Sequence, residues 1–184
     1  KLKIQTAVTV ALIASGIIPA VQAEVTDLSV DNPSDTTITN GSTSYAVDLD
    51  SGGPYTVINA GIISTILGKT SNISAIEIDE VAVTTLTNTG TMSAEGVGEY
   101  GRYGINVQTG VADAANASIG TLTNSGTISG TANGNAYGIQ AYAYSSTASI
   151  TSLTNSGDIS GTASNTRGYG IYLDGYNADA SITT

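Results

Sequence analysis

Carboxylates and arginines are the side chains of this chain that we consider for catalysis, because the sequence contains no histidine and no cysteine. Ser-His-Asp and Cys-His catalysis are therefore excluded, and no phosphate-binding loop of the Walker type is present. A polysaccharide lyase or glycosidase could work with carboxylates and an arginine. The candidates for such a reaction are Asp48, Asp50, Glu77, Asp79, Glu80, Arg102 and Arg167. Paired carboxylates need a set separation across a cleft. No spacing here indicates one, so we expect no catalytic residue and keep a carbohydrate-active enzyme as the alternative.

A metal site is suggested only by the segment Asp48-Leu-Asp50-Ser-Gly52-Gly53, which is rich in oxygen ligands of the kind that calcium prefers. The segment lacks the Glu at the twelfth position of an EF-hand. It also lacks the repeated Gly-Gly-x-Gly-x-Asp of calcium-binding β-rolls. We interpret it as a turn before Pro54, and expect neither a metal ion nor a cofactor.

One nine-residue phrase recurs three times, in forms close to Leu-Thr-Asn-Ser-Gly-Thr-Ile-Ser-Gly, at residues 86–94, 122–130 and 153–161. Each copy is followed by Tyr-Gly-Ile. These triplets begin at Tyr103, Tyr137 and Tyr169. Looser versions begin at Tyr45 and Ser74, so five units of about 30 residues can be counted. A period of this length is typical of solenoid proteins.

Within a unit, apolar and small residues alternate with polar ones, which predicts half-buried strands. A helical interpretation fails because glycine and β-branched residues are frequent and no 3.6-residue apolar stripe is present. Ile150 and Leu153 are three residues apart, so a regular strand would point them to opposite faces. If both point inward the chain must bend, and we expect a corner near Thr151 and Ser152. Short strands stacked in parallel predict an all-β fold, a parallel β-helix.

Stacking of the units would place identical residues above one another. Asn88, Asn124 and Asn155 would then form a ladder that exchanges amide hydrogen bonds between rungs. Asparagine also tolerates left-handed backbone geometry, which we expect here if the residue lies at a turn. A second structural column would consist of Tyr103, Tyr137 and Tyr169, for which a sugar-binding platform is the alternative. Unit length varies before and after Tyr-Gly-Ile, so recognition is expected in those loops.

The formal net charge of −10, with five Lys and Arg in total, excludes nucleic acid as a partner because phosphate binding needs clustered cations. Lys1 and Lys3 precede an apolar run from Ile4 to Ile18, and Val21-Gln22-Ala23 follows. This is the pattern of a helical signal peptide cleaved after Ala23. A membrane anchor is the alternative, although the run is shorter than the roughly 20 residues that span a bilayer.

The sequence thus divides into a signal peptide (1–23), an N-terminal cap region (24–40) and β-helix repeats (41–184) of about five rungs. Residues 180–184 match the start of the unit at Ala148, so we interpret the chain as the N-terminal part of a longer protein. Uncapped strand edges would make such a fragment self-associate.

The signal peptide, the Leu-Thr-Asn-Ser-Gly-Thr-Ile-Ser-Gly repeats and the absence of cysteine together resemble the passenger domains of Gram-negative autotransporters. The resemblance covers most of residues 57–184. It implies a right-handed parallel β-helix that is exported through the periplasm and displayed at the cell surface or released. It also implies a C-terminal outer-membrane β-barrel translocator as a partner. Related passengers act as adhesins, toxins and other virulence factors, which implies adhesion to a host-cell or matrix receptor or glycan, or a structural stalk.

Overall fold

A computed structural model describes residues 30–32, 37–39, 44–66, 71–110 and 115–183. The proposed signal peptide, residues 1–23, lies outside the described residues. In the described part, every regular element is a β-strand, and there are sixteen of them. No helix in this part is long and apolar enough to cross a membrane.

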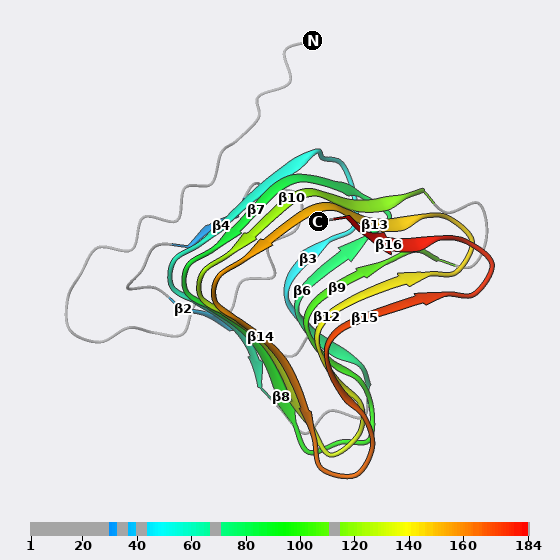
Figure 1. Cartoon of the computed structure of the whole chain (residues 1–184). Coiled ribbons are helices and arrows are strands. Elements are labelled where there is room, and N and C mark those ends of the chain that lie inside the picture. The colour runs from blue at the N-terminus through cyan, green and yellow to red at the C-terminus, as the bar shows by residue number, and fades with distance from the viewer. Residues whose placement is uncertain (1–29, 33–36, 40–43, 67–70, 111–114, 184) are drawn as a thin grey trace.

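The strands form three parallel sheets that the chain visits in turn (Figure 1). The first sheet contains β1 (Val30–Asn32), β4 (Tyr55–Asn59), β7 (Ala82–Asn88), β10 (Ala117–Asn124), β13 (Ala148–Asn155) and β16 (Ala180–Ile182). The second contains β2 (Thr37–Thr39), β5 (Ile62–Ile66), β8 (Thr91–Gly96), β11 (Thr127–Ala132) and β14 (Asp158–Ala163). The third contains β3 (Tyr45–Leu49), β6 (Ile73–Asp79), β9 (Arg102–Gln108), β12 (Ala136–Ala143) and β15 (Gly168–Gly175).

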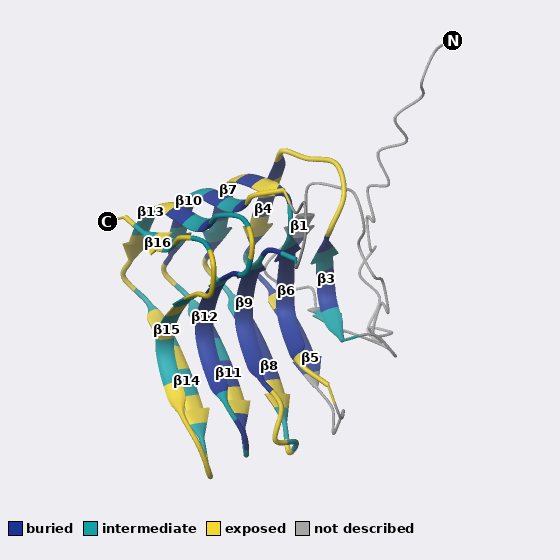
Figure 2. Cartoon of the chain, turned by 90° about the vertical axis from the view of Figure 1, so that its right-hand side faces the viewer, coloured by how far each residue is buried: buried dark blue, intermediate teal, exposed yellow. Residues whose placement is uncertain are grey.

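The fold is therefore an all-β parallel solenoid. Seen from its C-terminal end, the chain runs counterclockwise as it approaches the viewer, which makes the solenoid right-handed (Figures 1 and 2). The repeats are in register, since Leu86, Leu122 and Leu153 pair directly from strand to strand. Ile, Leu and Val from all three sheets meet in one narrow core along the axis. The 30-residue period of the sequence is thus one turn of the coil.

The first sheet bends inside its strands. Ile119 and Leu122 both contribute to the core, although they are three residues apart. The chain remains a single strand between them, and Gly120 is skipped in the pairing with β13. The change of alternation expected at the equivalent Thr151 and Ser152 is therefore present, but as an irregularity within β13 and not as a corner between two strands.

The third sheet is concave on its outer side, between the loops that precede and follow it (Figure 1). Tyr137 lies outside the core and Ile139 lies in it, so the side-chain alternation slips at Gly138. A Cβ at Gly138 would lie only 2.7 Å from Ile159 Cγ2 of the second sheet. Glycine at this position lets the two sheets approach closely at the narrow end of the cross-section.

The two ends of the solenoid differ. β1 and β2 fall within residues 24–40, the expected cap region, and pair in parallel with β4 and β5. The rest of that region is outside the described residues. At the other end, β14 and β15 are half-buried to exposed, whereas β6, β9 and β12 are buried (Figure 2). The last described rung therefore presents core-facing side chains to solvent.

Candidate functional site

The recurring asparagines lie above one another at the ends of strands in the first sheet. Nδ2 of Asn88 donates to Oδ1 of Asn124, and Nδ2 of Asn124 donates to Oδ1 of Asn155, both at 2.7 Å. The ladder extends toward the N-terminus through Asn59 and Asn32, again with 2.7 Å contacts. Each amide also donates to a backbone carbonyl, either in its own two-residue corner or in the second-sheet strand of the neighbouring rung. Asn88, for example, donates to Thr127 O at the start of β11. The asparagines thus satisfy one another and the corner of each rung.

Their backbone does not adopt the left-handed geometry expected from the sequence. Among the described residues other than glycine, only Glu80 has a positive φ, of 58°. Asn88, Asn124 and Asn155 instead end strands β7, β10 and β13. Asparagine is used here for its amide group, which fits between two rungs, and not for its backbone tolerance.

The tyrosines of the Tyr-Gly-Ile triplets form a column on the concave face of the third sheet. The rings of Tyr103 and Tyr137 stack with centroids 5.1 Å apart, and those of Tyr137 and Tyr169 are 6.0 Å apart. Tyr172, from the neighbouring column, packs at a tilt against both Tyr137 and Tyr169. Stacked and tilted arrangements of this kind stabilise aromatic clusters. Three rings therefore gather near the C-terminal end of the concave face.

Beside the tyrosines runs a column of polar residues in which Glu77, Asn106, Gln140 and Tyr172 are paired from strand to strand. The first three are buried although they point away from the core. Glu77 accepts hydrogen bonds from Ser74 Oγ (2.6 Å) and Asn106 Nδ2 (2.9 Å). Burial, reinforced by the nearby carboxylates of Asp79 and Asp48, raises the pKa of Glu77 to about 8. Concavity lets neighbouring side chains shield one another from solvent.

The carboxylates and arginines considered for catalysis do not converge. Glu77 and Asp79 lie on β6, while Arg167 precedes β15, three strands further along the sheet. At about 4.8 Å per strand, the separation is roughly 14 Å. Arg102 is nearer to the carboxylates, but it is fully buried and donates from Nη1 to the carbonyls of Ser71, Tyr100 and Gly101. Arg102 therefore stabilises the loops that precede β6 and β9.

The segment considered for calcium forms the turn after β3. Gly52 and Gly53 have positive φ values of 86° and 87°, and the hydroxyl of Tyr55 donates to Ser51 O. Asp48 is half-buried on β3 and Asp50 is exposed in the turn. Within the described ranges, no group of three or more acidic, histidine or cysteine side chains is arranged to hold a metal ion.

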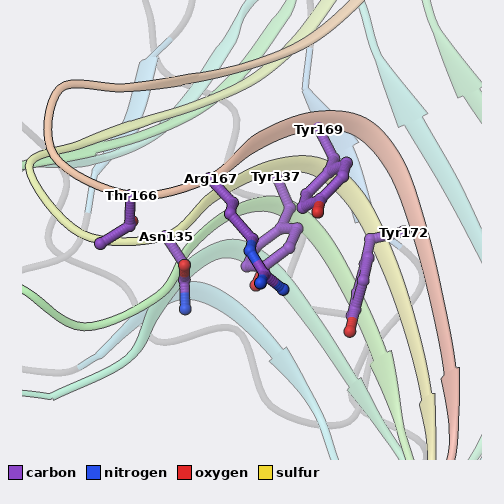
Figure 3. Close-up of a pocket in the computed structure, with 6 residues that line it drawn as sticks. All are labelled: Asn135, Tyr137, Thr166, Arg167, Tyr169 and Tyr172. Carbon is purple, nitrogen blue, oxygen red and sulfur yellow. The ribbon is translucent and has the colours of Figure 1, made fainter.

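A hollow of about 480 Å³ lies on the concave face near its C-terminal end. It is lined by Asn135, Tyr137, Thr166, Arg167, Tyr169 and Tyr172. Two of these residues, Tyr137 and Tyr169, come from the repeated triplet, whereas the loops that precede β12 and β15 supply Asn135, Thr166 and Arg167. Figure 3 shows their side chains projecting from the strands and the adjoining loops toward a shared space. We call this hollow the tyrosine–arginine groove.

Sequence reasoning named Tyr137, Tyr169 and Arg167, but not as parts of one site. Tyr172 was missed, and Asn135 and Thr166 were not singled out, although both lie in the loops where recognition was expected. A signal for Tyr172 exists in the repeats, because it replaces the amides Asn106 and Gln140 at its column position. Asn135 and Thr166 lie in loops of variable length, where alignment of the repeats carries no information about position.

The class of protein that the fold defines is a right-handed parallel β-solenoid. Comparison with protein-family models, with curated proteins and with solved structures finds no match to this chain. Function must therefore be argued from the solenoid and its groove.

Proposed function

We propose that this chain is an exported β-helix segment of an autotransporter-type passenger, displayed at the surface of a Gram-negative bacterium. There it acts by adhesion through its concave face and loops, and it also serves as a stalk. The observation that carries the proposal is the in-register solenoid, in which each rung is held by its neighbours through the asparagine ladder and the shared core. Such a scaffold leaves outward side chains and loops available for contact.

Two further features support the proposal. The sequence of residues 1–23 follows the signal-peptide pattern, which fits export. Length differences between turns fall in the loops on either side of the third sheet, where solenoids place recognition elements. A rigid rod with variable loops along one edge suits contact with a host-cell or matrix receptor, or with a glycan.

Export is tested by fusing residues 1–184, with a start methionine, to alkaline phosphatase that lacks its own signal. This enzyme is active only after export from the cytoplasm, so we expect activity in a Gram-negative host and a processed N-terminus at Glu24. A Leu12→Arg variant should abolish both, because a charge interrupts the apolar run. Cytoplasmic retention of the unmodified fusion would overturn the proposal.

Adhesion is tested with the processed protein coupled to beads, which are then added to cultured epithelial cells and to extracellular matrix. Binding above that of beads carrying albumin supports adhesion. If the protein is exported but does not bind, the adhesive part of the proposal fails and the stalk remains. Export and adhesion are therefore judged separately.

A carbohydrate-active enzyme is the weaker proposal, because the carboxylates of β6 and the exposed Arg167 lie on different rungs. Its test is turnover of acidic and neutral glycans by the processed protein and by an Asp79→Ala, Glu80→Ala variant. Turnover that the double substitution removes would favour the enzyme over the adhesive segment.

A further inference from the structure

We propose that the tyrosine–arginine groove binds an acidic saccharide, with Arg167 receiving the negative group and the tyrosines contacting the sugar ring. This inference rests on the proposed surface function and specifies the chemistry of one contact site. Three independent features of the groove carry it: its charge, its aromatic composition and its hydrogen-bonding groups.

The charge argument begins with the scarcity of cations. Within the described residues the only cationic side chains are Arg102 and Arg167. Arg102 is completely buried and occupied by backbone carbonyls, whereas Arg167 is exposed and lines the groove. A guanidinium group binds a carboxylate through two parallel hydrogen bonds. Arg167 therefore makes this groove the described surface best suited to a negative group.

The aromatic argument concerns Tyr137, Tyr169 and Tyr172, whose rings lie within 5.1 to 6.0 Å of one another. Tyr137 is 7% exposed and mainly supports the other two, while Tyr169 and Tyr172 are half-buried and offer ring surface. Such residues combine an apolar ring with a polar hydroxyl. A pyranose has the matching character, with an apolar C–H face and hydroxyls around its edge.

The hydrogen-bonding groups complete the site. The Tyr172 hydroxyl donates to Oδ2 of Asp174 at 3.4 Å, so its oxygen is oriented to accept a hydrogen bond from a sugar hydroxyl. Asn135 and Thr166 add an amide and a hydroxyl at the same rim (Figure 3). The hollow of about 480 Å³ lies in the range of roughly 300–1,000 Å³ found for small-molecule sites.

The negative net charge of the whole chain further restricts which class of anionic ligand can bind. With a net charge of −10, the protein repels highly charged polyanions such as nucleic acid. A saccharide with one carboxylate per ring presents a single charge to a single arginine. The charge density of the ligand thus matches the site, and its hydroxyls match the surrounding polar groups.

The test is calorimetric titration of the processed protein with two acidic saccharides and their uncharged counterparts. The probes are trigalacturonic acid with its methyl ester, and 3′-sialyllactose with lactose. We expect at least one acidic saccharide to bind about tenfold more tightly than its neutral partner, the effect of one charge-assisted contact. Absence of binding by both acids, or equal binding of the neutral forms, would overturn the inference.

Variants then locate the site. Arg167→Gln should remove the preference for the acidic saccharide, Arg167→Lys should keep part of it, and Tyr172→Phe should weaken binding several-fold. Ser160→Asp is the matched control, because it changes the net charge by −1, as Arg167→Gln does, at an exposed position on the second sheet. Equal loss in Arg167→Gln and Ser160→Asp would indicate a general charge effect and contradict the site. Circular dichroism checks that each variant is folded.

Failure here is distinguishable from failure of the proposed function. Successful export with no saccharide binding overturns only this inference. Cytoplasmic retention in the export assay overturns the surface function on which it rests.

Discussion

Asn124 shows how a single side chain joins three rungs of the solenoid. It is completely buried, accepts a hydrogen bond from Asn88 and donates to Asn155 and to the carbonyls of Gly126 and Asp158. An apolar side chain at this position would remove the amide acceptor of Asn88, which is itself completely buried. The ladder therefore specifies the register between rungs as well as contributing to stability.

Replacing Asn124 by alanine is expected to lower the free energy of unfolding by about 2 to 3 kcal/mol, because buried groups lose their partners. Asn155→Ala is the matched control. Asn155 is exposed at the end of the ladder and should cost less than about 1 kcal/mol. Urea unfolding followed by circular dichroism measures both, and equal effects of the two substitutions would contradict the proposed dependence on burial.

Glu77 makes stability depend on pH. Its pKa in the folded protein, about 8, is above the ordinary value of 4.5, so the folded state holds a proton that the unfolded chain releases. The free energy of unfolding should therefore fall as pH rises from about 4.5 to about 8, by up to roughly 1.4 kcal/mol per pH unit. Below this window Glu77 is protonated in both states and imposes no such penalty.

Glu77→Gln should flatten this part of the pH profile and stabilise the protein most at pH 8 and above. The reciprocal substitution Gln140→Glu places a carboxyl at a buried position of the same column and should introduce a comparable fall. Urea titrations at pH 5, 7 and 9 give the three profiles. A Glu77→Gln profile parallel to that of the unmodified protein would refute the assignment.

At the scale of elements, the narrow end of the cross-section depends on residues without side chains. A Cβ at Gly138 would approach Gly170 O at 2.6 Å, Ile159 Cγ2 at 2.7 Å and Ser160 N at 2.8 Å. Backbone atoms cannot move aside without shifting a strand. The second and third sheets can therefore pack this closely only where one of them lacks a side chain.

Gly138→Ala is expected to destabilise the solenoid by about 2 to 3 kcal/mol through overpacking. The control is Ala75→Gly in β6, which lies between Ser74 and Ile76, the residues that align through β9 with Tyr137 and Ile139. There a methyl group is already accommodated, so its removal should cost only about 0.5 to 1 kcal/mol. Thermal and urea unfolding compare the pair. A tolerated alanine at position 138 would show that the sheets can separate.

At the scale of the whole molecule, the last described rung is open. Ile171 and Leu173 stack on core residues of β12 but are 41% and 43% exposed, and among the described strands β14 and β15 are paired on one side only. Open edges of this kind bind other strands. We expect the purified chain to associate with itself, with the sedimentation coefficient rising with concentration.

Leu173→Lys should shift this equilibrium toward the monomer, because a charge at the edge opposes pairing. Ile58→Lys is the control: Ile58 is similarly exposed, at 44%, but lies on β4, which is paired on both sides by β1 and β7. Sedimentation velocity compares the two variants with the unmodified protein. An unmodified protein that remains monomeric at high concentration would contradict edge pairing.

Much of the solenoid follows from the repeats alone. Residues that recur at a constant interval must superpose when a chain coils in register, so Asn88, Asn124 and Asn155 could be placed in one column before their contacts were known. The alternation of Leu122, Asn124 and Ile128 with polar residues likewise predicts their inward orientation, since side chains on a strand point alternately to opposite faces. The two-residue corner after each asparagine is a consequence of the same regular spacing.

What only the tertiary structure decided is the shape of the third sheet and what its concavity brings together. Spacing along a chain does not specify curvature, so it could not show that Glu77 would be buried on an outward face. Nor could it show that Arg167, a residue of a variable loop, would meet Tyr137, Tyr169 and Tyr172 in one groove. Repetition determines which residues lie above one another along the axis. Curvature of a sheet, and the contacts that the curvature brings about, arise from side-chain packing, which the repeat period does not specify.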